Sequence, residues 1–427
     1  MASHVTERVA RLAAEHQPGH CLAQPFYTDP EVFDVDMDRI FRRHWILTGH
    51  VSQIPEPGDY FLYEIGGESI IVVRDKHNEI HALYNVCTHR GSRICVEPQG
   101  RAGALVCPYH AWAFDHNGEL RGARGMPDDF DRGCFSLRRC SVRIVHGMIF
   151  VFLGSDAPPE LDHVWRDVSP YLKQHGLAEA KICHRTQWTI GANWKLVVEN
   201  FAECYHCGPA HPEYCSVMVQ AISGSGIQKH IDEFERQSQE WREHWSSKGH
   251  FTGSIEPTEH ALHCATRMPI GKDGLSQSEG GKSVAPTMGE FTVNDGGVTA
   301  VRVHPGGYMI ACCDYAIVNR FTPLSVDQTL QEIVWLVHPD AQEGVDYDVD
   351  KVTWLWKVTT DEDQRLLESQ QRGVKSAAYR PGPYSNAETG VDKFVTWYLR
   401  QLVDSRQTSL NVSLHRPHKT KFGVQSL

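Results

Sequence analysis

The sequence predicts an α+β fold in which an all-β domain precedes a larger domain of antiparallel strands and helices. Between residues 58 and 154, apolar residues recur with a period of two in short runs separated by turns, which is typical of an antiparallel meander. Beyond residue 158, helical periodicity alternates with further strand-like runs. With 427 residues, 41% hydrophobic and 22% charged, the chain has a globular composition and room for two to four domains at roughly 100–200 residues each.

The first 45 residues favour helix. In the stretch DPEVFDVDMDRIF, Asp29 and Pro30 are a helix start signal. The apolar residues that follow fall on one helical face: Val32, Phe33, Met37, Ile40 and Phe41. We expect residues 1–45 to be a helical segment that packs on the C-terminal domain.

Residues 46–158 are expected to form the all-β domain. The runs DYFLYEI, ESIIVVRD and EIHALYNVC predict successive strands, joined by turns at Gly66–Gly67 and 76–78. The run GMIFVFLG predicts the last strand, which ends at Gly154. The residues SDAPPELD that follow are typical of a boundary between domains.

Residues 159–427 are expected to form the second domain. The run TIGANWKLVVENFAECYH predicts the end of a strand followed by a helix that Gly208 and Pro209 stop. A Gly- and Ser-rich stretch over 249–289 predicts a loop or flexible lid. The remaining predicted elements are a charged helix over 227–245, strands over 298–321 and 332–339, and helices over 349–371 and 388–402, with the polar tail 404–427 unassigned.

Charge and hydropathy exclude several classes of function. The formal net charge of −11 argues against a general surface for nucleic acid or for anionic membranes. No uncharged apolar run approaches the ~20 residues of a membrane-spanning helix. Charged residues from Glu7 to Glu15 interrupt the stretch in which a signal peptide would be apolar. We therefore expect a cytoplasmic protein with no nucleic-acid or membrane partner.

Two short motifs in the meander predict an iron–sulfur cluster. They are Cys87-Thr-His89 and Cys107-Pro-Tyr-His110. A Rieske [2Fe–2S] cluster needs two thiolates on one iron and two imidazoles on the other, and two hairpin tips with one Cys and one His each can supply them. The alternative is a tetrahedral zinc site, but zinc knuckles usually take two ligands of one type from each tip. The neighbouring Cys95 lies outside this pattern and is expected to be a packed thiol.

A second set of potential ligands follows in NWKLVVENFAECYHCGPAHP. His206 and His211 are five residues apart, which places them on different faces of a continuous helix. Pro209 is expected to end the helix and let His211 fold back beside His206. Two imidazoles and one carboxylate form the facial triad of non-haem iron(II) oxygenases, although two such histidines alone are also compatible with a structural role or a zinc site.

Asp363 is the preferred carboxylate for this triad. It shares a helical face with Leu366 and Leu367 and so points inward, whereas Asp361 points outward. A carboxylate on a buried face requires a partner, which a metal would supply. Thr360 is a possible N-cap, so the helix predicted from residue 349 could be broken there.

Glu203 and two cysteines surround the first histidine. Glu203 precedes His206 by three residues, so its carboxylate could hydrogen-bond that ring or bridge two metal centres. The alternative, a solvent-exposed helix acid without a role, is the weaker one beside two histidines. Cys204 and Cys207 form a CxxC that we expect to pack around the helix end, with redox or zinc chemistry as the alternatives.

Together, CTH…CPYH and NWK…EN…E.YH…HP closely resemble the Rieske non-haem iron ring-hydroxylating oxygenase α-subunits, over essentially the whole chain. The resemblance implies an N-terminal Rieske domain before a helix-grip catalytic domain. It also implies a head-to-tail homotrimer that receives electrons from NAD(P)H through a separate flavin and iron–sulfur reductase. For the cluster, the resemblance implies Cys87, His89, Cys107 and His110, and for the mononuclear iron it implies His206, His211 and Asp363. It further implies two catalytic residues, Asn200 and Glu203, the latter as the bridge for electrons between subunits.

One departure from the family pattern bears on the substrate. The aromatic-ring dioxygenases typically have Asp where this chain has Glu203, and Glu there is similar to the branch that acts on choline, carnitine and betaines. The run QRGVKSAAYRPGPYS also resembles betaine-demethylating members. The resemblance therefore implies O2-dependent hydroxylation of an N-methyl group, with release of formaldehyde. The alternatives are an aromatic-acid ring hydroxylase or dioxygenase and a Rieske electron carrier without oxygen chemistry.

A quaternary ammonium substrate would need particular side chains. A permanent cation is best held by aromatic rings, and the 11 Trp and 14 Tyr are enough to build such a cage. A substrate that also bears a carboxylate would need an Arg, Lys or amide partner. The sequence does not single out either set.

Overall fold

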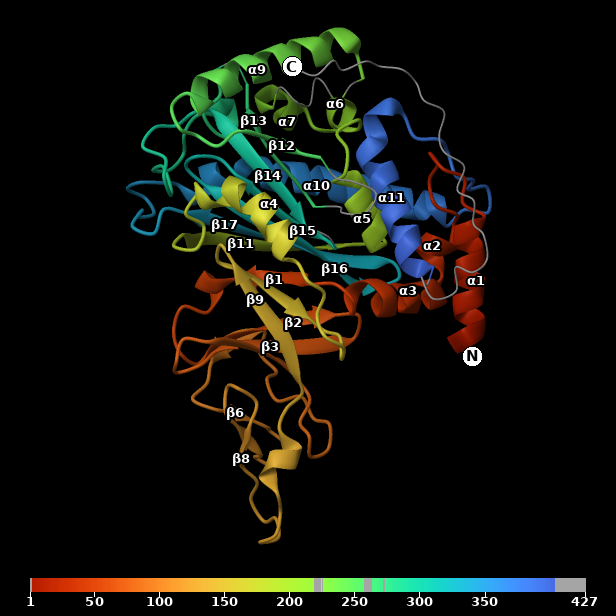
Figure 1. The fold of residues 1–427 in the computed structure, drawn as a ribbon, viewed down its shortest axis with the longest axis vertical. Coiled ribbons are helices and arrows are strands. Elements are labelled where there is room, and N and C mark those ends of the chain that lie inside the picture. Colours follow the sequence, from red (N-terminus) through yellow and green to blue (C-terminus); the bar gives the residue numbers. More distant parts are fainter. Residues whose placement is uncertain are drawn as a thin grey trace.

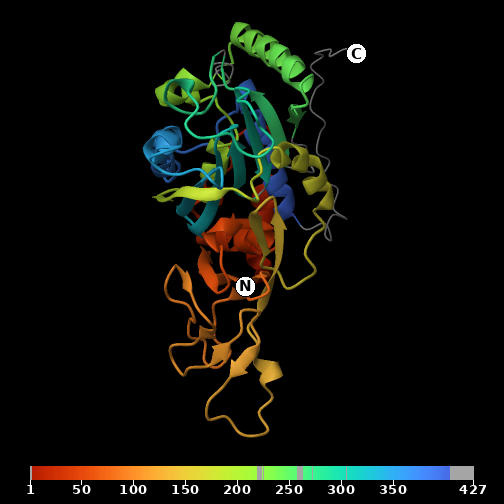
Figure 2. The ribbon, with the colours of Figure 1, turned by 90° about the vertical axis from the view of Figure 1, so that its left-hand side faces the viewer.

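A computed structural model describes residues 2–218, 224, 226–256, 263–271, 273–303 and 305–403. The chain forms a small all-β domain joined to a larger domain in which helices cover an antiparallel sheet (Figure 1). Figure 2 shows the same two parts from the side, with the tip of the small domain pointing away from the large one. The predicted α+β order, all-β first, is confirmed. None of the helices in the described part of the chain is long and apolar enough to cross a membrane.

The meander is built on a seven-stranded sheet. Its strand order is β1-β10-β9-β4-β3-β2-β5, and a separate three-stranded sheet, β6-β7-β8, lies near the tip of the domain. The strands are β1 (Ile46–His50), β2 (Asp59–Ile65), β3 (Glu68–Arg74), β4 (Ile80–Tyr84), β5 (Gln99–Arg101), β6 (Leu105–Val106), β7 (Ala113–Phe114), β8 (Leu120–Gly122), β9 (Arg139–Val145) and β10 (Met148–Phe152). The expected hairpins at 66–67 and 76–78 join β2 to β3 and β3 to β4 in antiparallel register.

The larger sheet is also antiparallel and seven-stranded, in the order β11-β17-β16-β15-β14-β13-β12. One face packs against α4 (Asp162–Lys173) and the all-β domain, and the other against α5 (Trp194–Asn200) and α10 (Val349–Val374). The strands are β11 (Lys181–Ile190), β12 (Gly253–Ile255), β13 (Cys264–Pro269), β14 (Gly297–Val303), β15 (Gly307–Ala311), β16 (Ala316–Ser325) and β17 (Gln328–Val337).

Two expectations for this domain are wrong in part. The stretch 249–289 is not all loop, because β12 and β13 pair in it and β13 continues the sheet through β14. Its residues 257–262 and 272 lie outside the described residues. The helix α10 is not broken at Thr360, because its N-cap is Asp348, whose side chain accepts from the backbone N–H of residue 350 at 2.9 Å. Burial of one face over 26 residues outweighs the local capping signal at Thr360.

The N-terminal segment packs on the second domain through a buried charged group. Its helices are α1 (Ala2–Ala14), α2 (Pro25–Thr28), α3 (Pro30–Asp36) and the π-helix η1 (Met37–Phe41), and they lie beside α11 (Thr389–Leu402). Asp36 forms an ion pair with Lys195, and both side chains are fully buried. The same carboxylate accepts hydrogen bonds from Trp194 Nε1 at 3.0 Å and from the Tyr398 hydroxyl at 2.6 Å.

Candidate active site

The two Cys–His motifs lie on a matched pair of loops. In each loop the residue four positions after the cysteine donates its backbone N–H to the cysteine carbonyl, at 2.9 Å for Gly91 and 3.0 Å for Ala111. Both residues have positive φ, 76° and 55°, which closes the two turns in the same way. The two loops therefore turn back on their cysteines in the same way, while the histidine follows the cysteine by two residues in one loop and by three in the other.

The side chains on these loops suit a two-iron cluster. Cys87 and Cys107 are each 2% exposed, whereas His110 is exposed at the surface. The rings of His89 and His110 are 4.6 Å apart. The Nδ1 atom of His89 is buried and makes no hydrogen bond within the described residues, so it is left with an unused lone pair or proton. A buried ring nitrogen without a partner beside buried thiols fits a metal centre better than a packed core.

Neighbouring residues of the cluster loops have structural roles. Trp112 is buried and stacks on His89 at 4.7 Å, so it fixes the ring plane of that histidine. Cys95 is buried as expected, and burial raises the pKa of its thiol to about 11. It therefore remains a neutral packed thiol at neutral pH.

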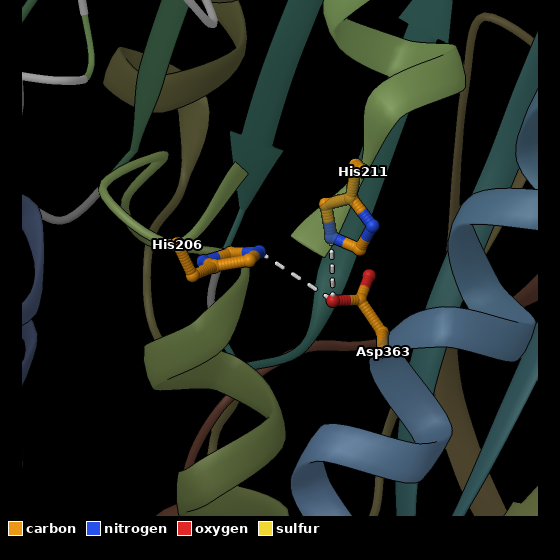
Figure 3. A group of neighbouring side chains, drawn as sticks. All are labelled: His206, His211 and Asp363. Atoms are coloured by element: carbon orange, nitrogen blue, oxygen red, sulfur yellow. Dashed lines mark hydrogen bonds and ion pairs between the residues drawn. The ribbon is translucent and has the colours of Figure 1, made fainter. Parts of the chain in front are cut away.

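The second set of residues converges on one point (Figure 3). His206 Nε2 lies 3.5 Å and His211 Nε2 3.1 Å from the same oxygen, Asp363 Oδ1. One ligand atom from each of these three residues lies within 4.8 Å of the others. Two imidazoles and one carboxylate in this arrangement fit the facial triad of a non-haem iron site.

The local path that joins the two histidines differs from the expected one. Helix α5 already ends at Asn200, and Pro209 lies inside a separate four-residue helix, α6 (Cys207–Ala210). His206 is the N-cap of α6 and His211 its C-cap, directly before α7 (Pro212–Val217). The expected meeting of the two rings occurs, but a short helix between them produces it rather than a proline stop.

A carboxylate holds the far nitrogen of each ring. Glu203 Oε1 lies 2.5 Å from His206 Nδ1, and Glu362 Oε2 lies 2.8 Å from His211 Nδ1. Such pairs fix the ring orientation and leave Nε2 free for a metal. Asp361 takes no part, because it accepts from Trp188 Nε1 at 2.8 Å on another side of α10.

Asn200 joins the triad from α5. Its Nδ2 donates to Asp363 Oδ1 at 3.1 Å and lies 3.4 Å from His206 Nε2. Its Oδ1 is buried without a hydrogen-bond partner in the described part of the chain. The side chain therefore carries an unused acceptor beside the three converging ligand atoms.

Ionisation at the triad is set by these contacts. Burial lowers the pKa of His206, but hydrogen bonds to Asp363 and Glu203 outweigh it and raise that pKa to about 9. Burial raises the pKa of Asp363, and the hydrogen bonds from both histidines lower it by more. Without a metal, protons hold the three side chains together, so metal binding displaces protons and strengthens as the pH rises.

Cys204 and Cys207 form a disulfide on either side of His206. Both cysteines pack against the apolar core at the beginning of α6, as expected, but the bond between them was not expected. A helix start at Cys207 brings the two sulfur atoms together, and no pattern in the sequence distinguishes that geometry from a packed CxxC. The bridge ties the segment that carries His206 to the beginning of α6.

A cavity of about 610 Å³ opens beside the triad. Its floor is the sheet face formed by alternate residues of β13, β14 and β15, among them Cys264, Thr266, Met268, Ala300, Arg302, Tyr308 and Ile310. Aromatic side chains of three helical segments complete the wall: Phe201, Tyr214 and Trp356. The cavity is large enough for a small organic substrate next to the expected iron.

Comparison with known proteins shows the family of each domain. Residues 44–136 match the family described as Rieske [2Fe-2S] domain, and residues 177–404 match the ring hydroxylating alpha subunit (catalytic domain). The chain belongs to the ring-hydroxylating oxygenase α-subunit family. The protein is therefore an oxidoreductase of the Rieske oxygenase type, with a [2Fe–2S] cluster and mononuclear iron.

Relatives of this oxygenase are similar over nearly the full length. The glycine betaine monooxygenase oxygenase subunit of Chromohalobacter salexigens is 37% identical over 96% of this chain and 92% of its own. The carnitine monooxygenase oxygenase subunit of Escherichia coli is 30% identical over 86% of this chain and 87% of its own. The crystal structure of a quaternary ammonium Rieske monooxygenase with L-carnitine shares the fold, with a TM-score of 0.68 at 23% identity over 92% of this chain and 99% of that one.

Replacing Glu362 with Ala is expected to weaken iron binding by about 10- to 100-fold, because His211 loses the carboxylate that fixes its ring and tautomer. Competition with a chelator of known affinity would measure the iron dissociation constant. Glu362→Gln keeps an acceptor for the ring N–H and should lose less. Unchanged affinity in both variants would show that His211 is positioned without Glu362.

Sequence reasoning missed the outer carboxylate and the cavity wall. Glu362 has no signal in the sequence, because on a helix it lies about 100° around the axis from Asp363. Only the fold shows that the ring of His211 lies beside the Glu362 carboxylate. No sequence pattern marks Phe201 or Trp356 as a cavity residue. Phe201 directly follows the end of α5, and Trp356 has the spacing of a core residue of α10. The alternation of β14 could have suggested that Arg302 shares a face with Ala300, but not that this face lines a cavity.

Proposed function

We propose that this oxygenase hydroxylates an N-methyl group of a quaternary ammonium compound, with glycine betaine or a related betaine as the substrate. The hydroxylated methyl group forms a carbinolamine, which breaks its C–N bond to give formaldehyde and a tertiary amine. The observation that carries the proposal is the aromatic wall of Phe201, Tyr214 and Trp356 beside the triad, since aromatic faces attract a cation that cannot form hydrogen bonds. The similarity to oxygenase subunits for glycine betaine and carnitine supports it.

The geometry described above supports a proposal for the residues that would hold the two metal groups. Cys87, His89, Cys107 and His110 would hold the [2Fe–2S] cluster, and His206, His211 and Asp363 the iron. When bound, the cluster supplies electrons and the iron activates O2. Glu203 and Glu362 orient the two imidazoles through their Nδ1 atoms, and Asn200 steadies Asp363.

The arrangement of the domains supports electron transfer between subunits of a homotrimer. The cluster loops lie towards the tip of the small domain, near β6, far from the α5–α10 side of the large sheet in both views (Figures 1 and 2). Apolar side chains are exposed around those loops, with Val106 49% and Tyr109 56% exposed, as a surface for a second copy would be. Tyr205, next to His206, is 50% exposed. Electrons would enter from a separate NAD(P)H-dependent flavin and iron–sulfur reductase.

Glu203 is the proposed bridge between the cluster of one subunit and the iron of the next. Glu203→Gln is expected to keep both metals but to lower product formation by about 10- to 100-fold, because the bridging charge is lost and the charged hydrogen bond to His206 becomes a weaker, neutral one. Cluster spectra, iron content and product yield should be measured together. Glu203→Asp keeps the carboxylate and should retain more activity, and a normal rate in Glu203→Gln would remove Glu203 from the electron path.

A single-turnover assay tests the proposed reaction. The chemically reduced, iron-loaded protein would receive O2 with glycine betaine, proline betaine, choline, carnitine or either of two aromatic acids. Formaldehyde and a product lighter by one CH2 would establish N-demethylation. Gain of one or two oxygen atoms on an aromatic acid, without formaldehyde, would establish ring hydroxylation instead. A Rieske carrier would produce neither and would contain only the cluster iron.

A further inference from the structure

Arg302 is the cationic side chain on the floor of the active-site cavity. It lies on β14 and pairs across the sheet with Cys264 of β13 and Tyr308 of β15, which also line the cavity. Its guanidinium carbon lies 5.3 Å from the centre of the Tyr308 ring, and Nη2 donates to the carbonyl of Phe201 at 2.7 Å. These contacts hold the guanidinium group in one place against the cavity wall.

Among the described residues, the side chain of Arg302 makes one hydrogen bond, to the carbonyl of Phe201. Its Nε is buried and has no acceptor among the described residues. Within the same part of the chain, no carboxylate lies within ion-pair distance of the half-buried guanidinium, whereas the fully buried Arg267 is paired with Asp295 at 2.7 Å. An arginine that is fixed in a cavity wall with spare donors and no counter-charge is suited to bind an anion.

A second cation near the cavity is in a different situation. Lys393 on α11 lies 3.9 Å from Glu256, and their side chains are 36% and 79% exposed. Lys393 therefore already has an acidic neighbour and contact with solvent. It is the natural comparison for Arg302, because it has the same charge and borders the same cavity.

We propose that Arg302 binds the carboxylate of the substrate, so that this oxygenase selects quaternary ammonium compounds that also bear a carboxylate over those that do not. The inference rests on the proposed function and adds the second point of recognition. Arg302 is bonded to the carbonyl of Phe201, and the preceding residue, Asn200, donates to Asp363. The carboxylate end of the substrate and its reacting N-methyl group would thus be positioned through two consecutive residues, Phe201 and Asn200.

Electrostatics explains the selection. A quaternary ammonium group without a carboxylate brings only positive charge into a cavity that already contains the Arg302 guanidinium, and partial burial strengthens the repulsion. A betaine brings a carboxylate that satisfies the spare donors, while its methyl groups contact the aromatic wall. The same residue therefore attracts one class of compound and disfavours the other.

The test compares substrates that differ only in charge. The holoenzyme would be given glycine betaine, its methyl ester and choline, and both formaldehyde formation and equilibrium binding by calorimetry would be measured. We expect kcat/KM and affinity for glycine betaine to exceed those for the ester and choline by about 10- to 100-fold. In Arg302→Met this preference should disappear, while Arg302→Lys should keep part of it.

Each contrary result has a distinct meaning. Equal use of the ester and glycine betaine by the wild-type protein would overturn the role of Arg302, whether or not the variants fold, and leave N-demethylation intact. Loss of the preference in Lys393→Gln rather than in Arg302→Met would assign the carboxylate to the other cation. No formaldehyde from any quaternary ammonium compound, with both metals present, would instead overturn the proposed function.

Discussion

Asp363→Ala is expected to lose its mononuclear iron while the [2Fe–2S] spectrum stays unchanged. The variant removes the oxygen on which His206 Nε2 and His211 Nε2 converge, and the cluster loops lie in the other domain. Iron affinity should fall by more than the roughly 10- to 100-fold decrease expected when a carboxylate behind a ligand histidine is removed. Iron content per cluster, measured by elemental analysis with electron paramagnetic resonance of the reduced cluster, gives the answer.

Asp361→Asn is the matched control for this variant. It alters a carboxylate two residues away on the same helix, but one that accepts from Trp188 rather than from the triad. We expect it to keep its iron. Retained iron and activity in Asp363→Ala would show that another residue supplies the carboxylate, and loss of iron in both variants would indicate that α10 itself had been disturbed.

Asp36→Ala is expected to lower the free energy of unfolding by about 3–5 kcal/mol, because it leaves the buried Lys195 ammonium without its counter-charge. Burial already lowers the pKa of Lys195, and the charge of Asp36 is the main interaction that opposes this shift. Trp194 and Tyr398 would lose their acceptor as well. Denaturant unfolding monitored by tryptophan fluorescence would measure the change.

Two further variants separate charge from packing at this site. Asp38→Ala, on the exposed side of the same segment, should change stability by less than about 1 kcal/mol. Asp36→Ala combined with Lys195→Met removes both charges and should recover part of the loss. If Asp36→Ala alone unfolds like the wild type, the ion pair contributes nothing and the N-terminal segment is held by apolar packing.

The sequence predicted most of the fold, because its strong signals are periodic. The strands β2 to β4 and the helical face of α3 lie where the pattern predicts them, although β2 and β3 are buried on both faces rather than on one. The short elements were harder to predict. Helix α6 has only four residues and contains Gly208 and Pro209, so tertiary contacts rather than propensity must hold it.

In the active site, too, the residues that could not be predicted are those whose role depends on tertiary contacts. His206, His211 and Asp363 could be proposed because each carries a chemical signal, a ligand type at an informative position. Glu362 and Arg302 could not be proposed from the sequence. Both are common surface residue types, and their role depends on which segments fold against them. The contacts of Arg302 link β14 to the end of α5, residues about a hundred positions apart in the chain.

The carboxylate of Asp36 also has a consequence for how the chain folds during synthesis. Its partner Tyr398 follows it by 362 residues, and at about 5–20 residues per second the ribosome needs roughly 20–70 s to make the intervening chain. Lys195 and Trp194 are made within that interval, but α11, which carries Tyr398, is still missing until its end. The N-terminal segment therefore completes its packing late, and a chaperone that shields α3 during translation is expected to raise the yield of folded protein.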